Sequence, residues 1–187
     1  MSAQDTTQPK KPNRSSRWST RQLAAMALFT ALGIILSFLE PSIIPGFEFL
    51  KYDASSVTAL LCGLSFGPAA GSIVGVVTAW MHALISGNIW GAVMNTGTVL
   101  AFVLPASIAY KRSQSTAALI VGLAISCVCM IIVALLMNLV VTPIYTGMPL
   151  DAVIALLPVL LLFNAIKVVI NSILSFIAIK SLKSFLK

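Results

Sequence analysis

Charged residues are scarce in this chain, and their scarcity excludes a soluble globular domain. Only 9% of the 187 residues are Asp, Glu, Lys or Arg, whereas hydrophobic residues make up 58%. A soluble domain carries about 25% charged residues. Water would solvate this chain poorly, but the hydrocarbon core of a bilayer suits it. The composition therefore predicts an integral membrane protein.

Residues that could perform catalysis or hold a metal are also few. The three cysteines lie in apolar runs without the spacing of a metal site, and the one histidine has no metal partner. The Gly-x-x-x-x-Gly-Lys-Ser/Thr phosphate loop and the zinc motif His-Glu-x-x-His are absent. No acidic pair lies within an apolar run, which argues against proton- or sodium-coupled transport. We therefore expect no enzyme, metal site, cofactor or nucleic-acid partner.

Long apolar runs are what the chain does have, and they predict an all-α bundle of six transmembrane helices. The runs cover about residues 21–39, 54–66, 69–85, 89–110, 117–141 and 152–179. A spanning helix needs about 20 apolar residues, so the second run is short. Residues 1–18 are polar and basic and predict a disordered cytoplasmic tail. Residues 19–187 form a single predicted transmembrane domain that binds a substrate.

The distribution of charge predicts the orientation of the helices. With six spans, ten basic residues fall on one side: Lys10, Lys11, Arg14, Arg17, Arg21, Lys111, Arg112, Lys180, Lys183 and Lys187. The opposite loops hold Lys51 and four acidic residues, Glu40, Glu48, Asp53 and Asp151. Positive residues mark the cytoplasm, so both termini are predicted to be cytoplasmic. An odd number of spans would destroy this segregation.

Lys167 is the only charged residue deep inside a predicted span. A charge in the bilayer is costly and usually functional. Asn164, Lys167 and Asn171 are spaced i, i+3, i+7 and share one helical face, which favours a polar pocket. The alternative is a lysine whose ammonium reaches the outer headgroups.

Two further amides, Asn95 and Asn138, lie near the outer ends of the fourth and fifth runs. Each alone could serve an interhelical hydrogen bond. Together with Asn164, Lys167 and Trp90 they predict one outward-facing cavity for a polar, aromatic or acidic solute. His82, at the end of the third run, is interpreted as a hydrogen-bonded interfacial residue rather than a ligand contact.

Small residues recur at every fourth position in two runs. One series is Gly67, Gly71, Gly75, Ala79 and Ala83, and the other is Ala27 and Ala31. Such faces let helices approach closely. The glycine series is interpreted as packing within the chain. Ala27 and Ala31 could equally form a docking face for another membrane subunit.

Several short stretches resemble the substrate-binding membrane subunit, or S component, of energy-coupling factor (ECF) vitamin transporters, and most closely its riboflavin-specific members. The matching stretches are residues 27–31, 49–57, 66–71, 102–106, 110–112 and 164–167, with Asn95, Asn138 and residues 143–145. They occur in the family's order and cover nearly the whole chain after the tail. The chain departs from the riboflavin members at Thr78 and Ala79, where these often carry Lys and Asn.

The resemblance implies a high-affinity vitamin-binding subunit in the plasma membrane of a prokaryote. Its partners would be a transmembrane coupling subunit, which meets Ala27 and Ala31, and two ABC ATPases. The loop from Glu40 to Asp53 would act as a lid.

By the same resemblance, Asn164 and Lys167 would bind the polar edge of a flavin, with Asn95 and Asn138 adding contacts. Phe49, Leu50 and Trp90 would pack on its ring. The open alternatives are another vitamin, such as pantothenate or a cobalamin precursor, and a membrane scaffold without a ligand.

Overall fold

The computed structural model describes residues 18–47 and 50–185, with side chains through residue 181, and these residues form an all-helical bundle. The helices are α1 (Thr20–Ser37), α2 (Ser55–Phe66), α3 (Pro68–Ser86), α4 (Ile89–Ser113), α5 (Thr116–Thr146) and α6 (Leu150–Phe185). All except α2 are long and apolar enough to cross a membrane. The predicted six-helix class is confirmed. Residues 1–17 of the predicted tail, and Phe49, lie outside the described residues.

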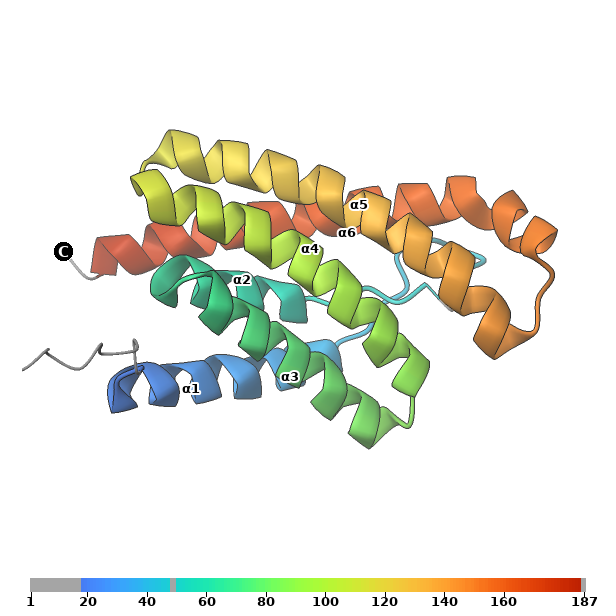
Figure 1. Cartoon of the computed structure of the whole chain (residues 1–187), viewed down its shortest axis with the longest axis horizontal. Helices are drawn as coiled ribbons and strands as arrows, with labels where there is room; N and C mark the ends of the chain where they lie inside the picture. The colour runs from blue at the N-terminus through green and yellow to red at the C-terminus, as the bar shows by residue number, and fades with distance from the viewer. Residues whose placement is uncertain (1–17, 48–49, 186–187) are drawn as a thin grey trace, which may run out of the picture.

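The helices run lengthwise, and the bundle has two distinct ends (Figure 1). The start of α1, the α2–α3 and α4–α5 connections and the end of α6 lie at one end. The loop between α1 and α2 and the α3–α4 and α5–α6 connections lie toward the other. The first end carries the described basic residues Arg21, Lys111, Arg112 and Lys180, so we assign it to the cytoplasm.

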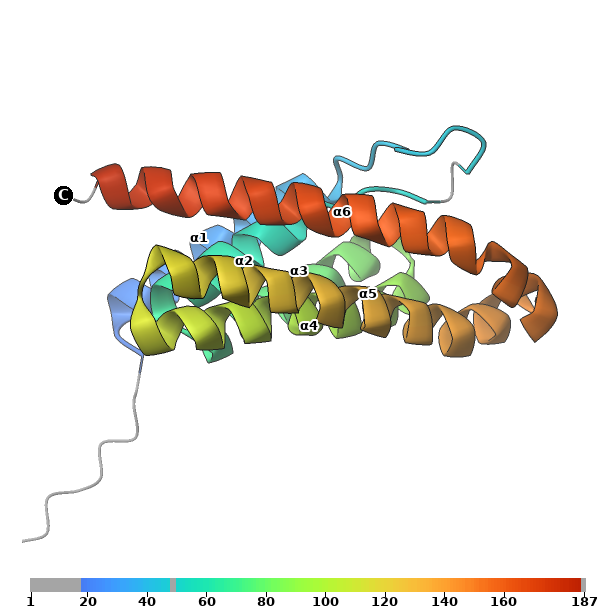
Figure 2. The same cartoon turned by 90° about the horizontal axis from the view of Figure 1, so that it is seen from above.

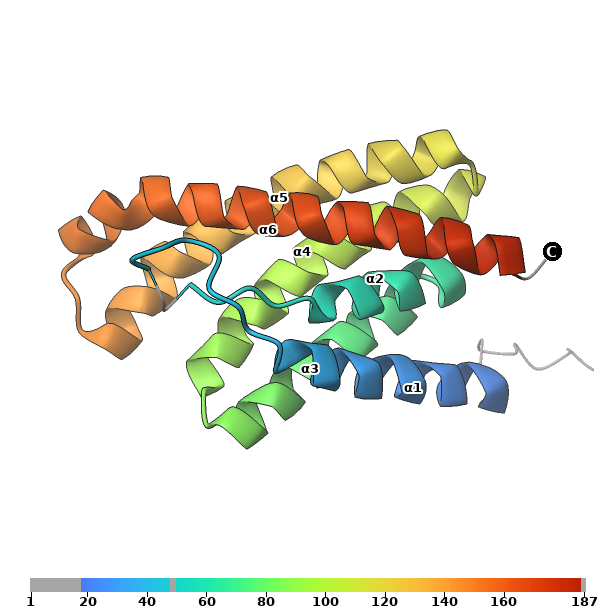
Figure 3. The ribbon, with the colours of Figure 1, turned by 180° about the vertical axis from the view of Figure 1, so that it is seen from behind.

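The short helix α2 fills only part of the bundle's length. Its 12 residues span about 18 Å at a rise of about 1.5 Å per residue, well short of the roughly 30 Å hydrocarbon core. The loop of residues 38–54, of which 38–47 and 50–54 are described, takes up the remaining length on the outer side, and its described parts run beside α6 (Figures 2 and 3). An isolated antiparallel bridge between Ser42 and Lys51 folds this loop back on itself. The chain thus places a non-helical segment beside the outer half of the bundle.

The glycine series on α3 packs inside the protein, as the sequence predicted. A Cβ added at Gly71 would lie 2.5 Å from the Cα of Gly63 and 2.6 Å from the carbonyl oxygen of Ala59, both on α2. At Gly75 an added Cβ would lie 2.8 Å from a methyl group of Val99 on α4. Because Gly71 and Gly75 have no side chain, α2 and α4 can approach α3 closely.

Helix α5 extends further than the sequence indicated. It was expected to end near Val141, before a loop at residues 142–149, but it continues through Pro143 to Thr146. A proline removes only one helical hydrogen bond, and lipid gives an unwound backbone no replacement for the others. The helix ends where Gly147 adopts a left-handed conformation, φ 70°, and donates its N–H to the carbonyl of Pro143 at 3.0 Å.

Candidate functional site

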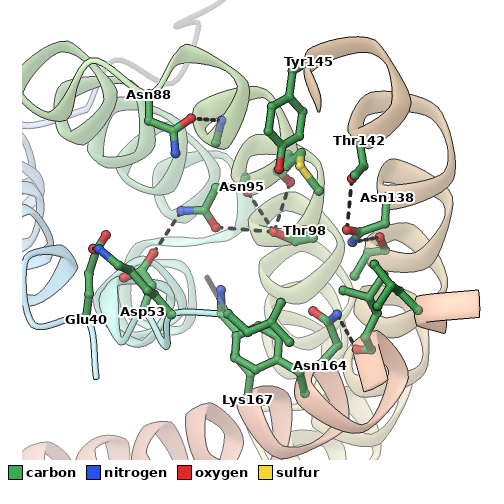
Figure 4. A pocket seen from close by; sticks show the side chains of 18 of the residues that line it. Glu40, Asp53, Asn88, Asn95, Thr98, Asn138, Thr142, Tyr145, Asn164 and Lys167 are labelled. Atoms are coloured by element: carbon green, nitrogen blue, oxygen red, sulfur yellow. Dashed lines mark hydrogen bonds and ion pairs between the residues drawn. The ribbon is translucent and has the colours of Figure 1, made fainter. Parts of the chain in front are cut away.

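A cavity of about 280 Å³ opens between the loop of residues 38–54 and the outer halves of α4, α5 and α6 (Figure 4). This volume lies near the lower end of the range for small-molecule sites, about 300–1,000 Å³. Apolar side chains in its wall include Leu50, Met94, Leu156, Leu160 and Phe163. Its polar and charged lining comprises Glu40, Lys51, Asp53, His82, Asn88, Asn95, Thr98, Asn138, Thr142, Tyr145, Asn164 and Lys167.

Helix α6 contributes a lysine and an amide, both largely buried. The Lys167 side chain faces the cavity, and the residue is only 9% exposed (Figure 4). This burial argues against the alternative in which its ammonium reaches the outer headgroups. Asn164, 6% exposed, donates its Nδ2 to the carbonyl of Leu160 one turn earlier, at 2.8 Å. This bond fixes the amide and leaves Oδ1 as an acceptor for a ligand.

Helices α4 and α5 supply the two other predicted amides. Asn138 Nδ2 donates to the carbonyl of Ala134 at 2.8 Å, and its Oδ1 accepts from the Thr142 hydroxyl at 3.3 Å. Asn95 Nδ2 donates across the cavity wall to Asp53 Oδ2 at 3.0 Å. Neither amide forms the hydrogen bond to a neighbouring helix that a purely structural role would require, because their partners lie in the loop or on the same helix. Both are held in defined orientations on the cavity surface (Figure 4).

The loop of residues 38–54 is tied to the bundle by charged and apolar contacts. Glu40 forms an ion pair with Lys51 at 2.7 Å, and its Oε1 lies 3.2 Å from Nε2 of His82 on α3. The His82 ring also packs against Phe38, with ring centroids 4.8 Å apart. Leu50 is buried in an apolar cluster with Leu160 and Phe163. The loop therefore covers one side of the cavity, a position suited to the predicted lid.

Two consecutive loop residues, Tyr52 and Asp53, connect the loop to different helices. Asp53 bonds Asn95 of α4, whereas the Tyr52 hydroxyl donates to Asn171 Oδ1 of α6 at 2.6 Å. Burial, with a smaller contribution from the charge of Asp53, raises the pKa of the Tyr52 phenol. The phenol therefore keeps its proton and remains a donor at neutral pH. Asn171 is on the predicted polar face of α6 but bonds the loop instead of lining the cavity.

Replacing Tyr52 by phenylalanine is expected to loosen the loop. The substitution keeps the ring but leaves the fully buried Asn171 amide without the phenol, at a cost of about 1–3 kcal/mol. Thermal unfolding in detergent should show a lower midpoint, and Tyr145→Phe, at a half-exposed tyrosine, should not. Equal midpoints for the two variants would show that the Tyr52–Asn171 bond contributes nothing.

The structure brings together most, but not all, of the predicted site residues. Asn95, Asn138, Asn164, Lys167 and Leu50 all line the cavity. Trp90 is 42% exposed and is not in its lining; its ring stacks on Tyr145, with centroids 6.5 Å apart, and Tyr145 does line the cavity. The predicted docking residues Ala27 and Ala31 are exposed on α1, which lies on another side of the bundle (Figure 1).

Several lining residues were not predicted as ligand contacts, among them Asp53 and His82. Asp53 precedes the apolar run of α2, and the only signal was its position two residues before Ser55, the first residue of that helix, whose backbone N–H donates to its carboxylate. His82 was interpreted as an interfacial residue; it does form a polar contact, with Glu40, but it also lines the cavity. Whether Asp53 and His82 line the cavity depends on how the loop of residues 38–54 folds back. The sequence pattern does not specify this.

Together the helices and the cavity define a multi-pass membrane protein with a cavity of mixed polar and apolar lining near its outer end. Comparison with known proteins identifies its class. The family model for the substrate-specific component of ECF transporters matches residues 21–179. The chain belongs to this family. Its members are binding subunits of a transporter and not enzymes, and membership implies association with an energy-coupling module and a vitamin substrate.

Two curated relatives and one solved structure are similar to the chain over most of its length. The riboflavin transporter RibU of Staphylococcus aureus (strain TCH60) is 31% identical, over 89% of this chain and 93% of its own. The riboflavin transporter FmnP of Bacillus subtilis (strain 168) is 28% identical, over 67% and 69%. A structure of the S component of a bacterial ECF transporter is 33% identical, over 89% of this chain and 98% of that chain, with a TM-score of 0.79.

One short pattern in α2 imitates a catalytic motif. Gly63-Leu64-Ser65-Phe66-Gly67 has the spacing Gly-x-Ser-x-Gly of a hydrolase nucleophile. Ser65, however, lies within the last turn of α2 near the cytoplasmic end, whereas His82, the chain's one histidine, lies at the outer end. Serine and base are therefore on opposite ends of the bundle, and the pattern has no catalytic geometry.

Proposed function

We propose that this chain binds riboflavin in the outer cavity and delivers it to an ATP-driven importer. The observation that carries the proposal is the convergence of Lys167 and the amides of Asn95, Asn138 and Asn164 on one cavity beside an apolar wall. Riboflavin has a flat ring system with a polar edge of alternating donors and acceptors, which amides and an ammonium complement. The two riboflavin transporters among its relatives support this choice of vitamin.

In the proposed complex, Lys167 donates to a ring carbonyl and the Asn164 amide bonds the same polar edge. Asn95 and Asn138 make further polar contacts, and Leu50 packs on the ring face from the loop. Tyr145 offers an aromatic surface to the ligand. The Trp90 ring stacks on the Tyr145 ring and supports its position. A contact with Phe49 remains a prediction from the sequence.

The energy for import would come from other subunits. We propose that Ala27 and Ala31 form the surface on which a transmembrane coupling subunit docks, together with two ABC ATPases. The alanines are exposed and sit beside the exposed apolar side chains of Leu23 and Leu28. Small residues let a partner helix come close, and in lipid such packing drives helix association. ATP hydrolysis in the partner complex would then accompany release of the vitamin inside the cell.

Calorimetric titration of the ligand-free protein in detergent tests the choice of vitamin. Riboflavin should bind with one-to-one stoichiometry, whereas pantothenate and a cobalamin precursor should not bind measurably. A corrin is much larger than a flavin, and a cavity of about 280 Å³ is far too small for it. Binding of pantothenate instead would move the assignment to another vitamin. Binding of none of the three would favour the ligand-free scaffold.

A further inference from the structure

The carboxylate of Glu40 joins three parts of the protein. Its Oε2 accepts from the Lys51 ammonium at 2.7 Å, and its Oε1 lies 3.2 Å from Nε2 of His82 on α3. Glu40 belongs to the outgoing arm of the loop of residues 38–54 and Lys51 to the returning arm, where an isolated antiparallel bridge pairs Lys51 with Ser42. The two arms of the loop and one helix of the bundle therefore meet at a single carboxylate.

His82 attaches the loop to α3 by two contacts. Its Nε2 faces the Glu40 carboxylate, and its ring packs against Phe38 at the start of the loop, with ring centroids 4.8 Å apart. The His82 side chain is 21% exposed and that of Glu40 26%. Both side chains are partly withdrawn from water, but solvent on the outer side still reaches the imidazole, so His82 can take up a proton from outside the cell.

The groups around His82 differ from it in the pH range over which they change charge. The other charged or titratable side chains that line the cavity are Glu40, Lys51, Asp53, Tyr145 and Lys167. Further charged residues on α1 and α4, which pack against α3, lie at the cytoplasmic end: Arg21, Lys111 and Arg112. Carboxylates ordinarily titrate below about pH 5, and lysines and tyrosines above about pH 8, whereas histidine titrates between these values. Around neutral pH the charge on the imidazole therefore changes while its neighbours keep theirs.

We infer that His82 is a positioning residue that fastens the loop beside the cavity through Glu40, and that protonation of its ring tightens this fastening. A neutral imidazole can donate one N–H to the carboxylate, whereas an imidazolium adds the attraction of opposite charges. The inference rests on the proposed function and adds a control on release. Because the loop covers one side of the cavity, a more firmly held loop should slow the release of riboflavin. Acid outside the cell should therefore lengthen the time for which the captured vitamin stays bound.

The test measures the rate constant of riboflavin release in detergent, from the recovery of flavin fluorescence after dilution, at about pH 5.5 and about pH 8. In the wild type, release should be roughly two- to fivefold slower at the lower pH, the range that a partly exposed ion pair provides. His82→Gln keeps an N–H donor but cannot gain a charge, and Glu40→Gln removes the carboxylate, so each should release riboflavin equally fast at both pH values. Asp151→Asn, which removes an exposed carboxylate outside the lining, should keep the wild-type ratio.

A measurement without ligand separates the inference from the proposed function. The backbone N–H of Tyr52 donates to the carbonyl of Pro41 at 3.0 Å, which joins the two arms of the loop. Hydrogen exchange of the loop amides, corrected for the intrinsic effect of pH, should be slower at the lower pH in the wild type but not in His82→Gln.

The outcomes distinguish the two claims. A wild-type protein that does not bind riboflavin would overturn the proposed function, and amide exchange alone would then decide the inference. Equal release at both pH values in the wild type, or a His82→Gln variant that keeps the wild-type ratio, would overturn the inference and leave riboflavin binding intact. Loop exchange that does not respond to pH in the wild type would overturn it as well.

Discussion

Lys167→Ala is expected to weaken riboflavin binding by more than about tenfold while the protein is still expressed and folded. Of the two lysines that line the cavity in the described part of the chain, Lys167 is largely buried, whereas Lys51 is exposed on the loop and paired with Glu40. The substitution removes the ammonium that would donate a hydrogen bond to the ligand. The ligand carbonyl, which is buried in the complex, is then left without a partner. Hydrogen bonds to charged groups contribute about 1.5–3 kcal/mol, which corresponds to the stated loss.

The matched control for this variant is Lys180→Ala. Lys180 is on the same helix but at the cytoplasmic end, where its ammonium lies 4.6 Å from the centroid of the Phe176 ring. Its replacement should leave riboflavin affinity unchanged. Equal affinities of the wild type and Lys167→Ala, with both proteins folded, would remove Lys167 from the site.

Gly71→Ala is expected to cause the largest loss of stability among glycine-to-alanine substitutions at the described glycines of the bundle. The added Cβ would lie 2.5 Å from Gly63 Cα and 2.6 Å from the carbonyl of Ala59, and neither atom can move without shifting the backbone of α2. Overpacking typically costs about 1–3 kcal/mol, and contacts with backbone place this variant at or above the upper end. Thermal unfolding in detergent should show a strongly lowered midpoint or little folded protein.

Gly97→Ala is the comparison for Gly71→Ala. Its added Cβ would lie 3.0 Å from the terminal methyl of Met137, a flexible side chain that can swing away. The same chemical change on α4 should therefore lower the midpoint only slightly. If the two variants unfold together, close packing of α3 on α2 is not what determines the stability of the bundle.

The sequence predicted the helices well because apolar length and charge segregation are direct consequences of the bilayer. It also predicted the polar face of α6, since helical periodicity places Asn164 and Lys167 side by side. It could not predict where α5 ends, because Pro143 resembles a helix breaker in water but is accommodated within a membrane helix.

The contacts of the loop of residues 38–54 are the part of the structure that the sequence pattern predicts least well. Its contacts join residues distant in the chain, such as Tyr52 with Asn171 and Asp53 with Asn95. No periodicity relates these pairs, so Asp53 was not recognised as part of the site. Trp90 was predicted to line the cavity, but it is not in the lining and its ring stacks on Tyr145.

The absorption spectrum of the protein purified from cells grown with riboflavin tests the central claim most directly. If the outer cavity is a riboflavin site, the protein should carry flavin absorption bands with quenched fluorescence, at about one flavin per chain. The bands should be weaker in Lys167→Ala than in the wild type. A colourless wild-type protein that also fails to bind added riboflavin would contradict the assignment, while the helical bundle and its family would stand.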